Sequence, residues 1–255
     1  AIKERITYML RLNKYLSEAG VCSRREADRL IEQGRVKVDG TPATVGMQVD
    51  EHAQITVDGK AVGEKKQKTI LIAVNKPRGI VCSEAHQGND TNIIEFLQYP
   101  KRITYMGRLD KDSEGLLILT NDGALANAVM HPSRHIKKRY RVTVRGEVTD
   151  DKLTTLASGV KIDTGVTLPC TVAVLAEEEN RTVLEFTIAE GKNRQIRKMC
   201  EAVKLQIVRL KRNAVGNIKL GMLKPGEWAD LTAEELKGLK ALVSSDKSTK
   251  RTGKK

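Results

Sequence analysis

An α+β fold in two domains is expected for this chain of 255 residues. Segments with strand periodicity outnumber helical ones and do not alternate strictly with them. That pattern favours a mixed, largely antiparallel sheet flanked by helices over a doubly wound nucleotide fold. The polar segment 63–69 lacks hydrophobic periodicity and is interpreted as a linker. The predicted parts are a small domain over 1–62, a larger domain over 70–243 and a disordered basic tail over 244–255.

The charge balance favours a polyanionic partner. The chain has 45 Lys and Arg residues against 32 Asp and Glu, a formal net charge of +13. Nucleic acid is the first candidate and an anionic membrane surface the second. No run of about 18 apolar residues is available to span a bilayer, and the charged start of the chain does not resemble a signal peptide. The four cysteines are widely spaced, which argues against a zinc site or a disulfide framework and fits a reducing cytoplasm.

The small domain is predicted to contain two short helices followed by a small sheet. Apolar residues recur at helical spacing over 12–19 and again over 27–31, and a glycine follows each segment. Ser23 and Glu26 have the spacing of a capping box at the start of the second helix. Two short alternating segments follow, and each runs into an Asp-Gly turn.

Basic side chains decorate this small domain, and any one of them would usually belong to a solvated helix face. Arg24 and Arg25 differ because they stand at a helix N-terminus, where free N–H groups and the helix dipole already favour an anion. A resemblance to the S4 domain, a small RNA-binding module, is carried by RLNKYLSEAGVCSRREADRLIEQGRVKVDG and extends over about residues 11–59. The candidate RNA contacts here are Arg11, Lys14, Arg24, Arg25 and Arg35.

The larger domain is predicted to be built from short strands and helices in irregular succession. Its first strand is expected to end before Asn75, where NKPRG interrupts the apolar run. An acidic turn over 177–180 is expected to join two antiparallel strands. Strands are expected at 70–74, 116–119, 140–144, 172–174 and 183–188 and in the stretch before 231. Helices are expected at 93–97, 124–130 and 153–156, in a segment that the stretch 191–197 leads into and that runs through 199 and 202, and from about 232.

The most informative segment of the larger domain is GRLDKDSEGLL, residues 107–117. Asp110 stands between Arg108 and Lys111 in a polar loop, directly ahead of an apolar run that is typical of a buried strand. A lone Asp in such a loop usually caps a helix or closes a turn. One that is surrounded by basic groups can instead stay ionised and act as a nucleophile.

Common cofactor and catalytic motifs are missing from the sequence. It contains no GxxxxGK[ST], no GxGxxG after a strand and no GxSxG, and its four histidines lack the spacing of metal ligands. We therefore expect a polar site that uses neither a metal nor an organic cofactor.

Two further segments are candidates to complete that site. Tyr140 follows a run of three basic residues and could present an aromatic face to an unstacked base; the alternative is a tyrosine packed in a strand. Arg194 and Arg197 lie at a predicted strand-to-helix turn. A guanidinium there could pair with the carboxylate and keep it ionised, or it could clamp a phosphate.

Four strings of the larger domain, in this order, resemble the RNA pseudouridine synthases of the RsuA family: NKPRGIV, GRLDKDSEGLLILTNDG, KRY and EGKNRQIRKM. With the S4-like domain, the resemblance covers about residues 11–235. It implies isomerisation of a ribosomal RNA uridine without any cofactor, with Asp110 as nucleophile, Tyr140 stacking on the target uracil and Arg197 as the partner of Asp110. The RNA contacts that it implies are Arg108, Leu109, Lys111, Lys137, Glu190, Gly191, Lys192, Asn193 and Arg194.

Within that family, two strings look most like the F-type enzymes, which modify a stem-loop of 23S rRNA: KYLSEAGVCSRREADRLIEQG and NRQIRKMCEA. MHPSR looks more like the B type. The resemblance thus implies a cytoplasmic, monomeric enzyme that acts on 23S rRNA. Three alternatives stay open at this point: a non-catalytic S4-type ribosome-binding factor, a hydrolase that uses Asp110 on RNA or a nucleotide, and the same isomerisation at a different rRNA site, of the B type or the small-subunit type. Whether Asp110 attacks the ribose or deprotonates it also stays open.

Overall fold

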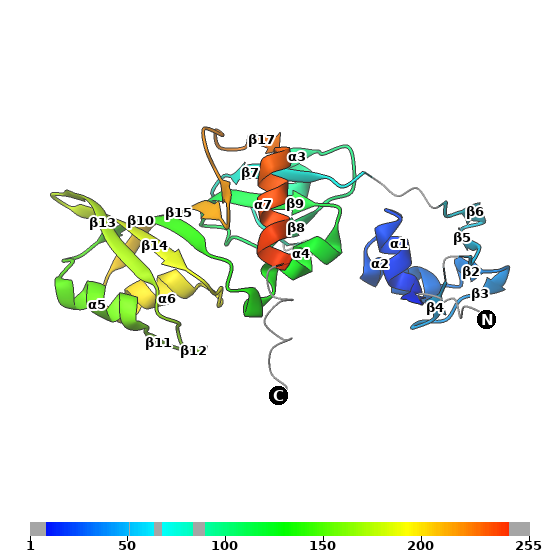
Figure 1. Cartoon of the computed structure of the whole chain (residues 1–255), viewed down its shortest axis with the longest axis horizontal. Coiled ribbons are helices and arrows are strands. Elements are labelled where there is room, and N and C mark those ends of the chain that lie inside the picture. Colours follow the sequence, from blue (N-terminus) through cyan, green and yellow to red (C-terminus); the bar gives the residue numbers. More distant parts are fainter. Residues whose placement is uncertain (1–8, 51, 64–67, 84–89, 245–255) are drawn as a thin grey trace, which may run out of the picture. The chain divides into compact units, whose positions relative to one another are not determined.

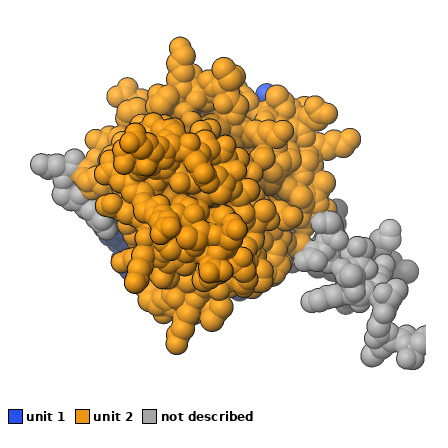
Figure 2. All heavy atoms as spheres, turned by 90° about the vertical axis from the view of Figure 1, so that its left-hand side faces the viewer, with its two compact units in different colours: residues 1–69 blue, residues 70–255 orange. Residues whose placement is uncertain are grey.

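The computed structural model describes residues 9–50, 52–63, 68–83 and 90–244. It divides the chain into two compact units, 1–69 and 70–255, each with its own hydrophobic core (Figures 1 and 2). Most of the predicted linker and all of the predicted tail except Ser244 lie outside the described residues. Among those that are described, no helix is long and apolar enough to cross a membrane.

The first unit contains the two helices and the small sheet that its sequence predicts. Ser23 caps the second helix, since its Oγ accepts a hydrogen bond from the Glu26 amide at 3.1 Å. The Glu26 carboxylate pairs with Arg29 at 2.9 Å, so the return bond of a capping box is replaced by an ion pair. The elements are α1 (Leu12–Glu18), α2 (Arg24–Glu32), the sheet β3 (Thr41–Pro42), β2 (Val36–Val38), β5 (Ile55–Val57) and β6 (Lys60–Ala61), and the pair β1 (Leu10–Arg11) and β4 (Gln48–Val49).

One mixed sheet forms the centre of the second unit. Its order is β13-β14-β10-β15-β9-β7-β17, with β16 paired to β15 and β8 paired to β9. Within the described strands of this sheet, every pairing is antiparallel except that of β9 with β15, which confirms the predicted mixed, largely antiparallel sheet. The strands are β7 (Leu71–Lys76), β8 (Thr104–Met106), β9 (Glu114–Thr120), β10 (Lys138–Arg145), β13 (Thr171–Glu178), β14 (Arg181–Ile188), β15 (Gln206–Val215), β16 (Ile218–Lys219) and β17 (Trp228–Asp230).

Helices cover both faces of this sheet. Alternate residues of β7 and β9 point to opposite sides, so Leu71 and Leu116 pack in one core and Ile72 and Leu117 in the other. In Figure 1, α5 and α6 lie beside β10, β13 and β14, whereas α4 and α7 lie beside β7, β8 and β9. The helices are α3 (Ile93–Leu97), α4 (Gly123–Met130), α5 (Asp150–Ser158), α6 (Gln195–Ala202) and α7 (Ala233–Ser244), and a separate pair of short strands is β11 (Lys161–Ile162) and β12 (Gly165–Val166).

The parallel pairing of β9 with β15, which we call the seam, is short and depends on a glycine. Gly115 lies opposite Arg212 across it. A Cβ on Gly115 would overlap the Arg212 carbonyl oxygen and would lie 2.8 Å from the Arg212 amide nitrogen, and the φ of Gly115 is +103°. Only glycine allows the two backbones to come this close. The loop that carries Asp110 enters the sheet at the seam.

Strand β7 ends two residues later than its sequence predicts. The expectation that it ends before Asn75 is wrong, because Asn75 and Lys76 remain in the strand and are buried. Their polar groups have distant partners: Asn75 Nδ2 donates to the Leu223 carbonyl at 2.7 Å, and Lys76 Nζ donates to the Ser113 carbonyl at 2.7 Å. Buried polar groups are tolerated when they are hydrogen-bonded in this way.

Candidate active site

The loop that carries Asp110 is fixed on one side by the end of β7 and the turn that follows it. Lys76 is fully buried, and its Nζ bonds the Ser113 carbonyl beside Asp110. The amide of Gly79 donates to the Lys111 carbonyl at 2.8 Å. Burial lowers the pKa of Lys76, and the charges nearby, Asp110 among them, oppose that effect. The loop therefore rests on a buried cation.

Arg212 on β15 fixes the same loop across the seam. Its Nε donates to the Leu116 carbonyl at 2.8 Å and its Nη1 to the Arg108 carbonyl at 3.3 Å. One guanidinium thus holds backbone on both sides of Asp110. Arg212 is 3% exposed, so the position of Asp110 is set by buried groups rather than by solvated ones.

Two arginines of the α6 region face the Asp110 carboxylate. Its Oδ2 lies 3.6 Å from Arg194 Nη1 and 3.9 Å from Arg197 Nε. These are ion-pair distances, and within the described part of the chain no hydrogen bond reaches the Asp110 side chain. The carboxylate is 33% exposed. It therefore lies in a positive field with its oxygens available to a substrate.

Asp112 holds the same arginines more closely. Arg194 Nη1 donates to Asp112 Oδ1 at 3.3 Å, and Arg197 Nη2 donates to the Asp112 carbonyl and to Ser113 Oγ at 3.1 Å each. Burial alone would raise the pKa of Asp112, but the hydrogen bond from Arg194 and the charges of both arginines lower it below its usual range. Asp112 thus positions the guanidinium groups and leaves Asp110 unbonded.

The turn before α6 is organised by Glu190 and Gln195. Glu190 Oε1 accepts hydrogen bonds from the Leu168 amide at 2.7 Å and from Gln195 Nε2 at 2.8 Å. Gln195 Oε1 in turn accepts from the Lys192 amide at 2.9 Å. Arg194 follows in the left-handed conformation, with φ of 50°. The structure places Glu190 inside this turn and presents its neighbours at the surface.

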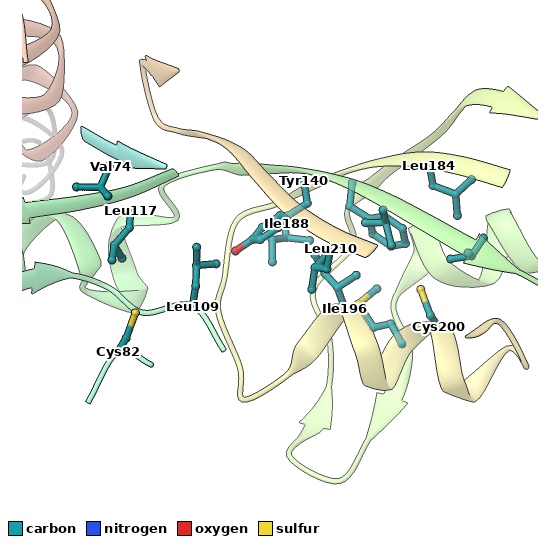
Figure 3. Packing of buried hydrophobic residues seen from close by; sticks show 14 of the residues in the cluster. Val74, Cys82, Leu109, Leu117, Tyr140, Leu184, Ile188, Ile196, Cys200 and Leu210 are labelled. Carbon is teal, nitrogen blue, oxygen red and sulfur yellow. The ribbon is translucent and has the colours of Figure 1, made fainter. Parts of the chain in front are cut away.

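A cavity of about 590 Å³ opens beside Asp110. Its apolar part includes Leu109, Tyr140, Ile188 and Leu210, and Figure 3 shows the Tyr140 hydroxyl pointing toward Leu109. Tyr140 is 9% exposed, so it packs in its strand and also lines the cavity. Charged and polar side chains form much of the rest of the lining, and most of the charged ones are basic. The cavity therefore offers both an apolar surface for a flipped base and positive charge for the RNA backbone.

The structure brings most candidate residues of the larger domain to this cavity. Lys137 is exposed and lies outside the lining, and Arg197 lines a neighbouring hollow from which it reaches Asp110. Lys111 pairs with Asp90 at 2.6 Å. Within the described residues, no cluster of His, Cys, Asp and Glu side chains could hold a metal ion. The candidates that line the cavity are Arg108, Leu109, Asp110, Lys111, Tyr140, Gly191, Lys192, Asn193 and Arg194.

The basic candidates of the first unit lie at its surface. Arg11, Arg24 and Arg25 are exposed. Lys14 pairs with Glu18 at 3.6 Å and Arg35 pairs with Asp58 at 2.6 Å. Arg24 and Arg25 therefore place two exposed cations side by side where α2 begins.

Sequence reasoning missed four residues of the site: Lys76, Asp112, Lys138 and Arg212. Asp112 could have been noticed, because it lies in the same loop as Asp110. Lys138 could have been found as well, since it precedes Tyr140 by two residues in a strand and so shares its face. Arg212 gave no local signal, because its role depends on the pairing across the seam.

Comparisons with known proteins identify the family of this chain. Residues 70–202 match the family model described as RNA pseudouridylate synthase, and residues 10–55 match the S4 domain. The dual-specificity RNA pseudouridine synthase RluF of Escherichia coli K12 is 42% identical over 94% of this chain and 81% of its own length. The ribosomal large subunit pseudouridine synthase B of Bacillus subtilis is 36% identical over 94% and 99%. A crystal structure of a pseudouridylate synthase superposes with a TM-score of 0.66 at 29% identity, covering 90% of this chain and 99% of that one. The chain therefore belongs to the RNA pseudouridine synthase family, with an S4 domain ahead of its synthase domain.

Proposed function

We propose that this protein isomerises a uridine of ribosomal RNA to pseudouridine, with Asp110 as the group that acts on the ribose. The observation that supports the proposal most strongly is the environment of the Asp110 carboxylate. It is fixed by buried backbone contacts, lies within 4 Å of two arginines and accepts no hydrogen bond from the described residues. A nucleophile or base needs this combination of fixed position, negative charge and free lone pairs.

The reaction rearranges bonds without a net change in composition. The N1–C1′ bond of the uridine breaks, the base turns, and C5 bonds to C1′; the proton on C5 leaves and N1 gains one. Asp110 either bonds C1′ or removes a proton from the ribose. The balance requires no redox equivalent. Tyr140 would cover the base, and Arg194 in the cavity and Arg197 in the neighbouring hollow would keep Asp110 oriented and charged.

The first unit would anchor the RNA. Arg24 and Arg25 stand at the start of α2, where the exposed guanidinium groups add to the helix dipole. We propose a stem-loop of 23S rRNA as the target, because the identity to RluF and to synthase B extends over both domains. A monomer acting in the cytoplasm completes the proposal.

The test is incubation with unmodified 23S and 16S rRNA transcripts, followed by carbodiimide mapping, in which primer extension stops at pseudouridine. We expect a stop in 23S with the wild type and none with Asp110→Ala. Asp163→Ala, which removes an exposed aspartate that pairs with Lys198, is the control and should keep the stop.

The alternatives predict different results. A non-catalytic S4-type factor would bind the RNA and leave no stop. A hydrolase would release a base or a fragment, whereas isomerisation preserves the mass and the length of the RNA. A primer-extension stop in 16S rRNA alone would show that the proposed reaction is right and that the proposed 23S target is wrong.

A further inference from the structure

The cavity contains two buried cations whose charges have no part in the proposed chemistry. Lys138 and Arg212 are 7% and 3% exposed, and both line the cavity with Asp110. Lys138 precedes Tyr140 by two residues on the same face of β10, and Arg212 lies directly opposite Tyr140 on β15. The two charges therefore flank the ring that is proposed to cover the base.

Neither charge is balanced within the described part of the chain. Arg212 Nη2 is fully buried without a partner, although Nε and Nη1 hold backbone carbonyls. Lys138 is a buried residue that makes no side-chain hydrogen bond or ion pair with the described residues. Burial lowers the pKa of Lys138, and the charge of Arg212 lowers it further. Glu190 opposes these effects, but it is already engaged by the Leu168 amide and by Gln195.

Two buried like charges without a counter-ion are unfavourable in the empty site. An anion between them would remove that penalty. The neighbouring wall is apolar, formed by Ile188 and Leu210, whereas the basic groups suited to the RNA backbone, such as Arg108 and Arg194, are exposed at the rim. The anion that fits this wall is flat, largely apolar and charged at its edge.

We propose that Lys138 and the free Nη2 of Arg212 receive the negative charge that develops on the uracil when it leaves the ribose. This role rests on the proposed function. Heterolysis of the N1–C1′ bond leaves its electron pair on the uracil, where the charge spreads over N1, O2 and O4. Asp110 meets the electron deficiency at C1′, either by bonding it or by taking a ribose proton. When C5 bonds to C1′, the C5 proton leaves and N1 is protonated, so the negative charge on the uracil is neutralised.

Two consequences follow for the reaction. A fixed cation in a cavity of low dielectric stabilises developing charge far better than one in water. It also retains a detached base that is no longer held by any covalent bond. Lys138 would therefore act on the chemical step and hardly on the affinity for RNA.

The test compares Lys138→Met with the wild type in single turnovers at saturating RNA, using target sites that carry uridine or 5-fluorouridine. The RNA is digested with nuclease, and the loss of unreacted uridine or 5-fluorouridine is measured. This readout works for both substrates, because it does not depend on the release of a proton from C5. Fluorine makes the uracil a better leaving group. We expect the substitution to slow the uridine reaction about 100-fold and the fluorinated one only about tenfold. Lys219→Met removes an exposed lysine on β16 and should leave both rates unchanged.

Lys138→Gln, which keeps polarity without charge, should reproduce the selective loss. Equal losses on both substrates in either variant would overturn the inference, because a structural defect does not depend on the leaving group. A weaker affinity and a salt slope reduced by about one, with an unchanged rate, would also overturn it and assign Lys138 to a phosphate. If the wild type forms no pseudouridine, both the proposed function and this inference are wrong. If the wild type is active and Lys138→Met is equally active, only this inference is wrong.

Discussion

Basic side chains are used differently in the two units. In the first unit, Arg11, Arg24 and Arg25 are exposed, and their field reaches into solvent, where salt screens it. In the second unit, Lys76 and Arg212 are buried and hold the backbone of one loop. The formal charge of +13 therefore combines an electrostatic attraction for RNA with a short-range framework for chemistry.

The two aspartates of the loop differ in how closely the arginines hold them. Asp112 accepts hydrogen bonds from Arg194, whereas Asp110 receives only longer ion pairs. The closely bonded carboxylate holds the two arginines, and the loosely paired one is the group that we propose to react. Hydrogen bonding, rather than residue type or burial, separates the two roles, because the two side chains are similarly exposed, at 33% and 41%.

Breaking the seam should have the largest effect, because it disturbs the buried framework without removing a charge. Gly115→Ala places a Cβ against the backbone of Arg212 at a φ of +103°. We expect a loss of more than about 4 kcal/mol in the free energy of unfolding. Urea denaturation followed by the fluorescence of Trp228, the single tryptophan, measures this in the second unit. Gly221→Ala, with φ of +59° and open space around it, should lose only about 1 kcal/mol, and equal losses would contradict the role of the seam.

Removing the organising carboxylate should lower activity without abolishing it. Asp112→Asn weakens the hold on Arg194 and Arg197. We expect the single-turnover rate at saturating RNA to fall about 10- to 100-fold. The matched control is Asp163→Asn, which frees Lys198 on α6, the helix that also carries Arg197. A loss as complete as that of an Asp110 variant would show that the two aspartates do not have separate roles.

Removing the exposed cations should affect binding more than chemistry. Arg24→Ala combined with Arg25→Ala is expected to weaken RNA affinity about tenfold and to reduce the salt slope by about two. Arg29→Ala, on the same helix but paired with Glu26, should change both less. Filter binding at several salt concentrations measures the affinity and its salt dependence. An unchanged salt slope would show that the two arginines do not contact the RNA backbone and that the first unit does not anchor the RNA through them.

The smallest effect should appear in acid. The pKa of Asp112 is lowered in the folded chain, so its ion pairs stabilise the fold above the unfolded pKa of about 4. That contribution is lost as the pH falls through the lowered value. Because the side chain is 41% exposed, we expect only about 0.5 kcal/mol. Trp228 denaturation curves should show this acid dependence weakened in Asp112→Asn.

Local patterns were sufficient to predict most elements of the fold. Helical periodicity located α1 and α2, and the Asp-Gly pairs located hairpin turns in which Asp39 and Asp58 are left-handed, with φ of 50° and 51°. The end of β7 was mispredicted because Asn75 is satisfied by a carbonyl 148 residues away. Partners at that distance leave no trace in the local pattern.

The candidate site was predictable where a residue stands within a motif. Asp110, Tyr140 and Arg194 line one cavity, as the motifs suggest. Arg212 could not be predicted, because its importance depends on the parallel pairing that places it across from Gly115. Glu190 is a member of a motif, yet the structure uses its carboxylate within the turn.

The most direct test of the central claim is the single-turnover rate of Asp110→Asn on 23S rRNA, an exchange that keeps the size of the side chain and removes its charge. We predict no detectable pseudouridine, with RNA affinity within about twofold of the wild type and an unchanged Trp228 denaturation curve. Turnover at the wild-type rate would contradict the assignment of Asp110 as the reacting group.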